Sequence, residues 1–130
     1  MNSVKLFKKV SLDFTADSYK SSIKGLINVG NSASLGAGVG VLYSGCNMLW
    51  RVTYDEVIFV HEGDFEIIVN DKSYPAESGD VLWIPANTEL TYMANEDVMF
   101  FYAVYPADKS PSTNVAINYP ETSPEIIEIV

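Results

Sequence analysis

One carboxylate in this chain is a candidate for acid–base chemistry. Glu56 lies in a largely apolar stretch, residues 55–60. A carboxylate enclosed by apolar side chains is poorly solvated, so its pKa rises towards neutral pH, where a general acid or base works best. Tyr54, Tyr92 and Tyr102 could supply a partner hydroxyl. Such a pair could run an isomerisation, lyase or cyclisation step without a metal.

The other reactive side chains are isolated in the sequence. His61 is the only histidine and Cys46 the only cysteine, so no disulfide can form within the chain. We interpret His61 as a surface turn residue and Cys46 as a small buried or edge residue. Residues 30–40 are rich in Gly, Ser and Ala but lack the spacing and following helix of a phosphate-binding loop. They are predicted to form a flexible connector leading into a strand.

Length and composition predict one folded domain. The chain has 130 residues, of which 48% are hydrophobic and 19% charged, which excludes both a two-domain enzyme and a disordered chain. The net charge of -9 repels phosphate backbones and anionic lipids, so neither nucleic acid nor a membrane is an expected partner. We find no leader peptide and no apolar run near the ~18 residues of a membrane span, and expect a cytoplasmic protein.

Pro and Gly divide the chain into short pieces, and no stretch of a dozen residues shows a convincing helical pattern. Turn signals every eight to twelve residues or so predict an all-β sandwich or barrel. The turns His61–Asp64 and Asn70–Asp71 are predicted to close hairpins. The predicted strands are Val4–Leu12, Ile23–Val29, Gly38–Tyr43, Met48–Val52, Glu56–Val60, Phe65–Val69, Lys72–Pro75, Asp80–Ile84, Leu90–Met93 and Val98–Tyr105.

Two glycine-containing segments are similar to the paired motifs of the cupin family. Glu56 to Gly63 fits the pattern E(X)6G and Gly79 to Pro85 fits G(X)5P, with fifteen residues between them. The resemblance implies a single jelly-roll β-barrel with extended N- and C-terminal segments. It also implies that each glycine closes a tight hairpin, that the proline ends a strand, and that Glu56 points into the barrel.

The histidines that bind metal in cupins are absent from the matching positions. In the first motif they fall on Trp50 and Val52 or, with the other spacing, on Leu49 and Arg51, and in the second motif the histidine falls on Leu90. The one family ligand that remains is a carboxylate, whereas transition-metal catalysis generally needs about three protein ligands or more. We therefore predict no bound metal and no other cofactor.

A narrower resemblance is to the EutQ family of ethanolamine-utilisation cupins, which have likewise lost the metal histidines. It covers residues 34–106, the predicted barrel core, which lies between N-terminal strands in residues 1–33 and an extended tail in residues 107–130. The resemblance implies association with bacterial microcompartments and acetate kinase activity. The matching segments are Trp50-x-x-x-Tyr54-Asp55-Glu56-Val57, Val60-x-Glu62-Gly63, Gly79-Asp80-Val81-x-Trp83-Ile84-Pro85 and Phe101-Tyr102-Ala103-Val104-Tyr105-Pro106.

If Glu56 points inward, strand alternation defines a pocket. The predicted catalytic residues are Glu56 and Tyr54, with Arg51 and Asp55 facing outward; in residues 82–84, either Trp83 or its two neighbours face inward. A structural role for Glu56, held by hydrogen bonds to Tyr54 or to backbone amides, is the open alternative. The predicted ligand-binding residues are Trp50, Tyr54, Glu56, Trp83, Leu90, Tyr92 and Tyr102.

We therefore predict a EutQ-like cupin that binds a small organic molecule in an aromatic barrel pocket. The alternative is a metal-independent enzyme of isomerase, lyase, cyclase or acetate-kinase-like type, with Glu56 as acid or base beside a tyrosine. A homodimer is expected, because small cupins are commonly dimers and because an apolar C-terminus and a lysine-rich N-terminal strip suit a contact between acidic barrels. The apolar C-terminal residues are Ile126, Ile127, Ile129 and Val130.

Overall fold

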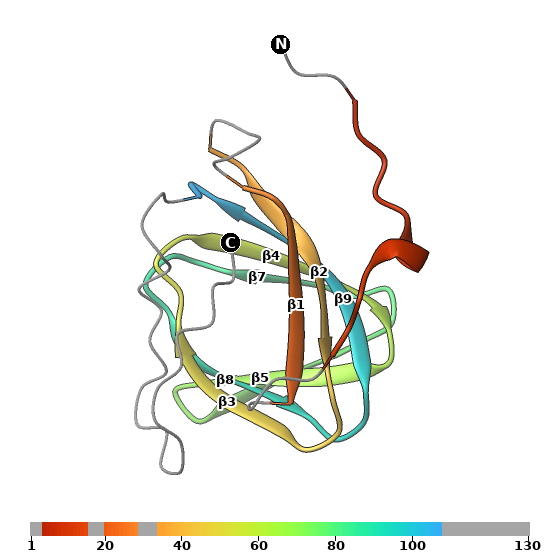
Figure 1. The fold of residues 1–130 in the computed structure, drawn as a ribbon. Coiled ribbons are helices and arrows are strands. Elements are labelled where there is room, and N and C mark those ends of the chain that lie inside the picture. The colour runs from red at the N-terminus through yellow and green to blue at the C-terminus, as the bar shows by residue number, and fades with distance from the viewer. Residues whose placement is uncertain (1–3, 16–19, 29–33, 108–130) are drawn as a thin grey trace.

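The protein folds into two antiparallel β-sheets that face each other as the walls of one barrel (Figure 1). A computed structural model describes residues 4–15, 20–28 and 34–107. The five-stranded sheet has the order β1-β2-β9-β4-β7 and the four-stranded sheet the order β3-β8-β5-β6. The strands are β1 (Ser21–Ile27), β2 (Gly36–Leu42), β3 (Cys46–Arg51), β4 (Asp55–Glu62), β5 (Asp64–Val69), β6 (Lys72–Glu77), β7 (Val81–Ile84), β8 (Glu89–Ala94) and β9 (Val98–Tyr105).

Nine of the ten predicted strands are confirmed, with ends that differ by at most two residues. The prediction of a strand at Val4–Leu12 is wrong. This segment contains the short 3-10 helix η1 (Lys9–Ser11), closed by the Leu12 N–H donating to the Lys9 carbonyl at 3.0 Å. The segment alternates in composition like a strand, but a strand also needs a neighbouring strand to satisfy its backbone groups, and none of the described strands pairs with these residues. The predicted tail beyond Ala107 lies outside the described residues.

The two predicted hairpin turns have different outcomes. Asn70 and Asp71 both have positive φ angles, 50° and 65°, as a two-residue type I′ turn requires, and they join the paired strands β5 and β6. Gly63 instead links β4 in one sheet to β5 in the other, so it forms a corner rather than a hairpin. Gly79 likewise joins β6 to β7 across the two sheets. A turn residue fixes the local reversal of the chain but not the sheet that the next strand joins.

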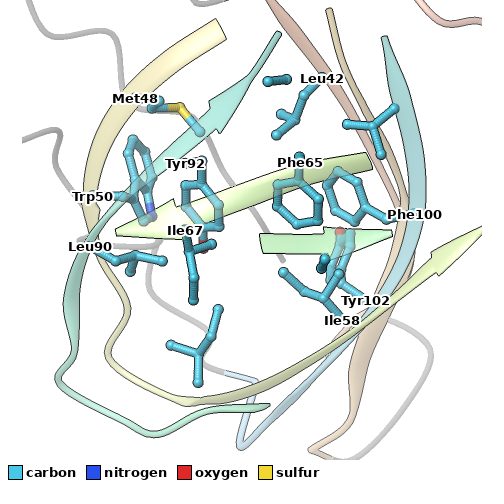
Figure 2. Packing of buried hydrophobic residues seen from close by; sticks show 14 of the residues in the cluster. Leu42, Met48, Trp50, Ile58, Phe65, Ile67, Leu90, Tyr92, Phe100 and Tyr102 are labelled. Carbon is cyan, nitrogen blue, oxygen red and sulfur yellow. The ribbon is translucent and has the colours of Figure 1, made fainter. Parts of the chain in front are cut away.

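The core lies between the sheets, where the inward side chains of both meet (Figure 2). Phe65 of β5 stacks on Phe100 of β9, with their ring centroids 5.8 Å apart. Strand β2 makes room for the β9 rings with glycines: a Cβ atom on Gly38 would lie 2.7 Å from the Tyr102 hydroxyl oxygen. The glycine-rich segment predicted as a connector is therefore part of a strand from Gly36 onward. No helix of the described residues is long and apolar enough to cross a membrane.

The two corner glycines allow a matched test of the packing at the corners. Both have φ angles of 90° or more, so replacement by alanine strains either backbone. A Cβ atom on Gly63 would lie 3.0 Å from the Val98 Cα, whereas a Cβ atom on Gly79 would meet nothing within 4 Å. We expect Gly63→Ala to lower the free energy of unfolding by roughly 1–3 kcal/mol more than Gly79→Ala does, as measured by denaturant titration. Equal losses would show that the corner at Gly63 is not tightly packed.

Candidate functional site

The barrel interior contains one buried carboxylate, that of Glu56. It projects inward from β4, a central strand of its sheet, where it lies opposite Val104 of β9 and Ile84 of β7. Only 2% of its surface is exposed. Tyr92 reaches it from β8 of the facing sheet and donates its hydroxyl hydrogen to Glu56 Oε1 at 3.0 Å. This hydrogen bond therefore links the two walls of the barrel.

Burial changes the protonation of this pair. Loss of solvent raises the pKa of Glu56 to about 7, although the hydrogen bond from Tyr92 opposes the rise. Burial raises the pKa of Tyr92 well above its ordinary value, and the nearby charges of Glu56 and Tyr54 raise it further. Tyr92 therefore remains a protonated donor, while Glu56 can gain or lose a proton near neutral pH.

Two further polar groups are buried in the same interior. Trp50 Nε1 and the Tyr102 hydroxyl have no hydrogen-bond partner among the described residues. Trp50 lies on the same side of the core as Tyr92 and Leu90, and Tyr102 lies beside Phe100 (Figure 2). Burial raises the pKa of Tyr102, with a smaller contribution from the charge of Glu56, so its hydroxyl remains a donor. Unpaired buried donors are rare in native proteins, and a bound water or ligand is one of their explanations.

The open space beside Glu56 is small. A cavity of about 10 Å³ adjoins the carboxyl and Tyr92, which is room for about one water molecule. A larger molecule can enter only if lining side chains move, and methionine, with three rotatable bonds, adapts most readily. The other lining residues are Ile23, Leu42, Met48 and Phe100. The sequence prediction missed these four, although Met48 and Phe100 alternate with predicted residues two positions away.

The structure brings all but one of the predicted site residues into the barrel. The inward orientation of six is confirmed; their roles in ligand binding stay predictions. Trp83 is the exception: 66% of its surface is exposed, and Ile84 occupies the inward position, so the prediction that Trp83 lines the pocket is wrong. Of the three tyrosines that could supply a partner hydroxyl, Tyr92 donates to Glu56, and the predicted catalytic role of Tyr54 stays a prediction. The six inward residues are Trp50, Tyr54, Glu56, Leu90, Tyr92 and Tyr102.

The described residues do not form a metal site. No three His, Cys, Asp or Glu side chains are grouped as ligands there. With either spacing, the residues at the expected cupin histidine positions are not the usual metal ligands; they are Trp50 and Val52 or Leu49 and Arg51, together with Leu90. His61 is exposed, as predicted, but it lies in β4 and not in a turn, and its carbonyl accepts a hydrogen bond from Ser78 Oγ at 2.9 Å. The residues present therefore do not fit the metal of the cupin fold.

The outward carboxylate next to Glu56 has a structural contact. Asp55 Oδ1 accepts a hydrogen bond from the Ala86 backbone N–H at 2.8 Å, across the end of β7. This bond holds the loop that follows the second glycine–proline segment. Asp55 therefore holds the backbone at Ala86 from outside the barrel, and the carboxyl that lies inside the barrel is that of Glu56.

Comparison with known proteins assigns the family. The model of the family "Ethanolamine utilisation protein EutQ" matches residues 1–111. The relative "Acetate kinase EutQ" of Clostridioides difficile strain 630 is 31% identical over 72 residues, which are 49% of this chain and 46% of that protein. The chain thus spans about half the length of that relative.

Solved structures confirm the fold. An ethanolamine utilisation protein Q from Salmonella typhimurium LT2 superposes with a TM-score of 0.74 at 24% identity, covering 81% of this chain and 88% of that one. The cupin domain of Schizosaccharomyces pombe Cnp3 superposes with a TM-score of 0.63 at 15% identity, covering 77% and 72% of the two chains. The protein is therefore a cupin-fold member of the EutQ family.

Proposed function

We propose that this protein binds a small organic molecule inside its barrel, in contact with Glu56. The observation that carries the proposal is the pair of buried donors, Trp50 Nε1 and the Tyr102 hydroxyl, without partners among the described residues. Each unsatisfied donor costs about 1–3 kcal/mol, which a ligand carrying an acceptor oxygen would recover. The lining of the small cavity beside Glu56 includes neither donor, so a ligand with a carbonyl or carboxyl oxygen and an apolar body would have to extend from Glu56 to reach them.

The protonation of Glu56 adds to this match. With a pKa of about 7, Glu56 is largely neutral below neutral pH and can then donate a hydrogen bond to a ligand oxygen. The volume of about 10 Å³ requires the ligand to be very small or to displace lining side chains. Met48, whose side chain is the most adaptable of the lining, is the residue we expect to move.

The same geometry favours metal-independent acid–base catalysis as a second candidate. A carboxyl with a pKa of about 7 accepts and returns a proton at comparable cost, as a general acid or base requires. Tyr92 donates to that carboxyl at 3.0 Å and steadies its charged form. In such a reaction Glu56 would take a proton from one substrate atom and deliver it to another, with no change in oxidation state.

Acetate kinase activity is suggested by similarity to relatives such as the acetate kinase EutQ of Clostridioides difficile, of which this chain covers 46%. Phosphoryl transfer needs cations around the transferred phosphate. The only arginine, Arg51, is exposed outside the barrel, and Glu56 is the only charged residue among the described buried ones. The interior therefore favours a neutral or protonated organic ligand over a magnesium nucleotide.

Glu56 should make folding stability depend on pH. Its pKa is raised from the ordinary 4.5 to about 7, so the folded protein binds a proton that the unfolded chain has released. The contribution of this proton to the free energy of unfolding is fully present below pH 4.5 and is lost as pH rises through 7. We expect the wild type to lose about 2.5 kcal/mol between pH 5 and pH 8 relative to Glu56→Gln, measured by denaturant unfolding. Parallel pH profiles for the two proteins would contradict the shifted pKa.

Ligand retention should depend on the buried donors. Native mass spectrometry of the protein purified without chelator should show a retained organic molecule, and elemental analysis should show no stoichiometric transition metal. Tyr102→Phe removes only a hydroxyl, and we expect it to lower the affinity for the molecule released from the wild type by roughly 5–10-fold. The control is Tyr74→Phe at an exposed position of β6. A bound metal, or equal affinity in the Tyr102 variant, would overturn the proposal.

Glu56→Gln separates the binder from the enzyme. The substitution keeps the shape of the side chain but removes proton transfer. For the molecule released from the wild-type protein, we expect the affinity to change by less than about 10-fold. If that molecule is also converted, turnover should fall by about 100-fold or more, since that is the usual contribution of a general acid or base. Turnover that survives in Glu56→Gln would exclude Glu56 as the acid or base.

A further inference from the structure

One residue in the lining of the cavity beside Glu56 reaches the surface of the molecule. This residue is Ile23, which is half-buried and packs against the edge of the core. The other five lining residues each have 5% or less of their surface exposed. Ile23 is therefore the lining side chain that separates the cavity from solvent.

Ile23 lies where two strand edges approach each other. Strands β1 and β3 are the outermost strands of their sheets, and each pairs with one neighbour only, β1 with β2 and β3 with β8 (Figure 1). The cavity is lined from both edges, by Ile23 of β1 and by Met48 of β3. No pairing joins these two strands in the described part of the chain. We call the region between Ile23 and Met48 the β1–β3 boundary.

Glycines weaken the attachment of β1 to its one neighbour. Cross-strand side-chain pairs stabilise a sheet, but Ile23 lies opposite Gly40, and Gly25 lies opposite Gly38. A Cβ atom on Gly40 would lie 2.8 Å from Ile23 Cδ1, so the end of the isoleucine side chain lies over bare backbone. A register shift between Gly25 and Ile27 also interrupts the ladder. An edge strand held in this way opens at a lower free energy than a central strand.

The other edge of the same sheet provides a contrast. Leu82 of β7 is half-buried and packs against the core, as Ile23 does, but it does not line the cavity beside Glu56. The two edges of the five-stranded sheet therefore differ in their access to the carboxyl. A route through the middle of either sheet would have to break backbone hydrogen bonds between paired strands.

We propose that small molecules enter the barrel at the β1–β3 boundary and that Ile23 controls their entry. A molecule that displaces the Ile23 side chain reaches the cavity without breaking a strand pairing, and the flexible side chain of Met48 makes room on the other side. Ile23 thus limits the size of what can reach Glu56. The proposal rests on the proposed binding function for its ligand, but the route can be tested without that ligand.

Acrylamide, a small neutral amide that quenches tryptophan fluorescence on contact, is the probe. Trp50 is buried and lies two positions from Met48 on the same face of β3, and in the Trp83→Phe background it is the only tryptophan. We expect Ile23→Ala in that background to raise the quenching constant of Trp50 by roughly 5-fold or more, because the shorter side chain no longer closes the route.

Leu82→Ala is the matched control, since it shortens a half-buried aliphatic side chain at the other edge of the sheet. We expect it to change the quenching constant by less than about 2-fold. Circular dichroism checks that both variants are folded. If Ile23→Ala does not fold, Ile23→Val removes one methylene group and should raise the constant by about 2-fold.

Two results would overturn the proposed route. Unchanged quenching in the Ile23 variants would place the entry elsewhere. An equal rise in Ile23→Ala and Leu82→Ala would mean that loss of packing loosens the whole core.

The proposed route and the proposed function can fail separately. If the wild-type protein retains an organic molecule, we expect Ile23→Ala to release it roughly 10-fold faster, because a lid residue sets the rate of exchange. A retained molecule with an unchanged release rate would contradict the route and leave the binding function in place. Increased quenching in Ile23→Ala without any retained molecule would support the route and contradict the binding function.

Discussion

The hydrogen bond between Tyr92 and Glu56 is the contact on which the interior depends. A carboxyl without water is tolerated when it is protonated or hydrogen-bonded, and here a phenol from the facing sheet donates to it at 3.0 Å. The bond links β8 to β4, so it fixes the relative position of the two barrel walls at the point where the chemistry would occur. The apolar side chains around the carboxyl exclude solvent, and this loss of solvent raises the pKa of Glu56.

Strand alternation made much of this interior predictable. From Trp50 to Val60, every second residue was expected inside, and these residues are buried, whereas Arg51, Asp55 and Val57 face outward. The pattern succeeds here because side chains along a strand alternate with a period of two, and because the cupin resemblance places the side chain of Glu56 inside the barrel. Tyr92 could not be separated from Tyr54 as the partner of Glu56, since that choice depends on how the two sheets face each other.

The errors have a common physical origin. Trp83, Gly63 and the segment Val4–Leu12 were each interpreted from local composition, and each depends on a distant neighbour. Val81, Leu82, Trp83 and Ile84 are all apolar, so alternation gives no contrast by which to choose the inward face. Gly63 allows the turn whichever sheet follows. Residues 4–12 have the composition of a strand, but among the described residues no strand lies beside them to pair with.

Strands β4 and β7 carry apolar side chains on both faces, so the interior site and the outer surface of the sheet are built on the same strands. β4 lies between β9 and β7, and it carries Glu56 on one side and Val57 and Phe59 on the other. The core packs against the inner face of β4, which leaves this strand little freedom to move. Met48 lines the cavity beside Glu56 from β3 of the facing sheet, so the space around the carboxyl can adapt from the opposite wall while β4 stays in place.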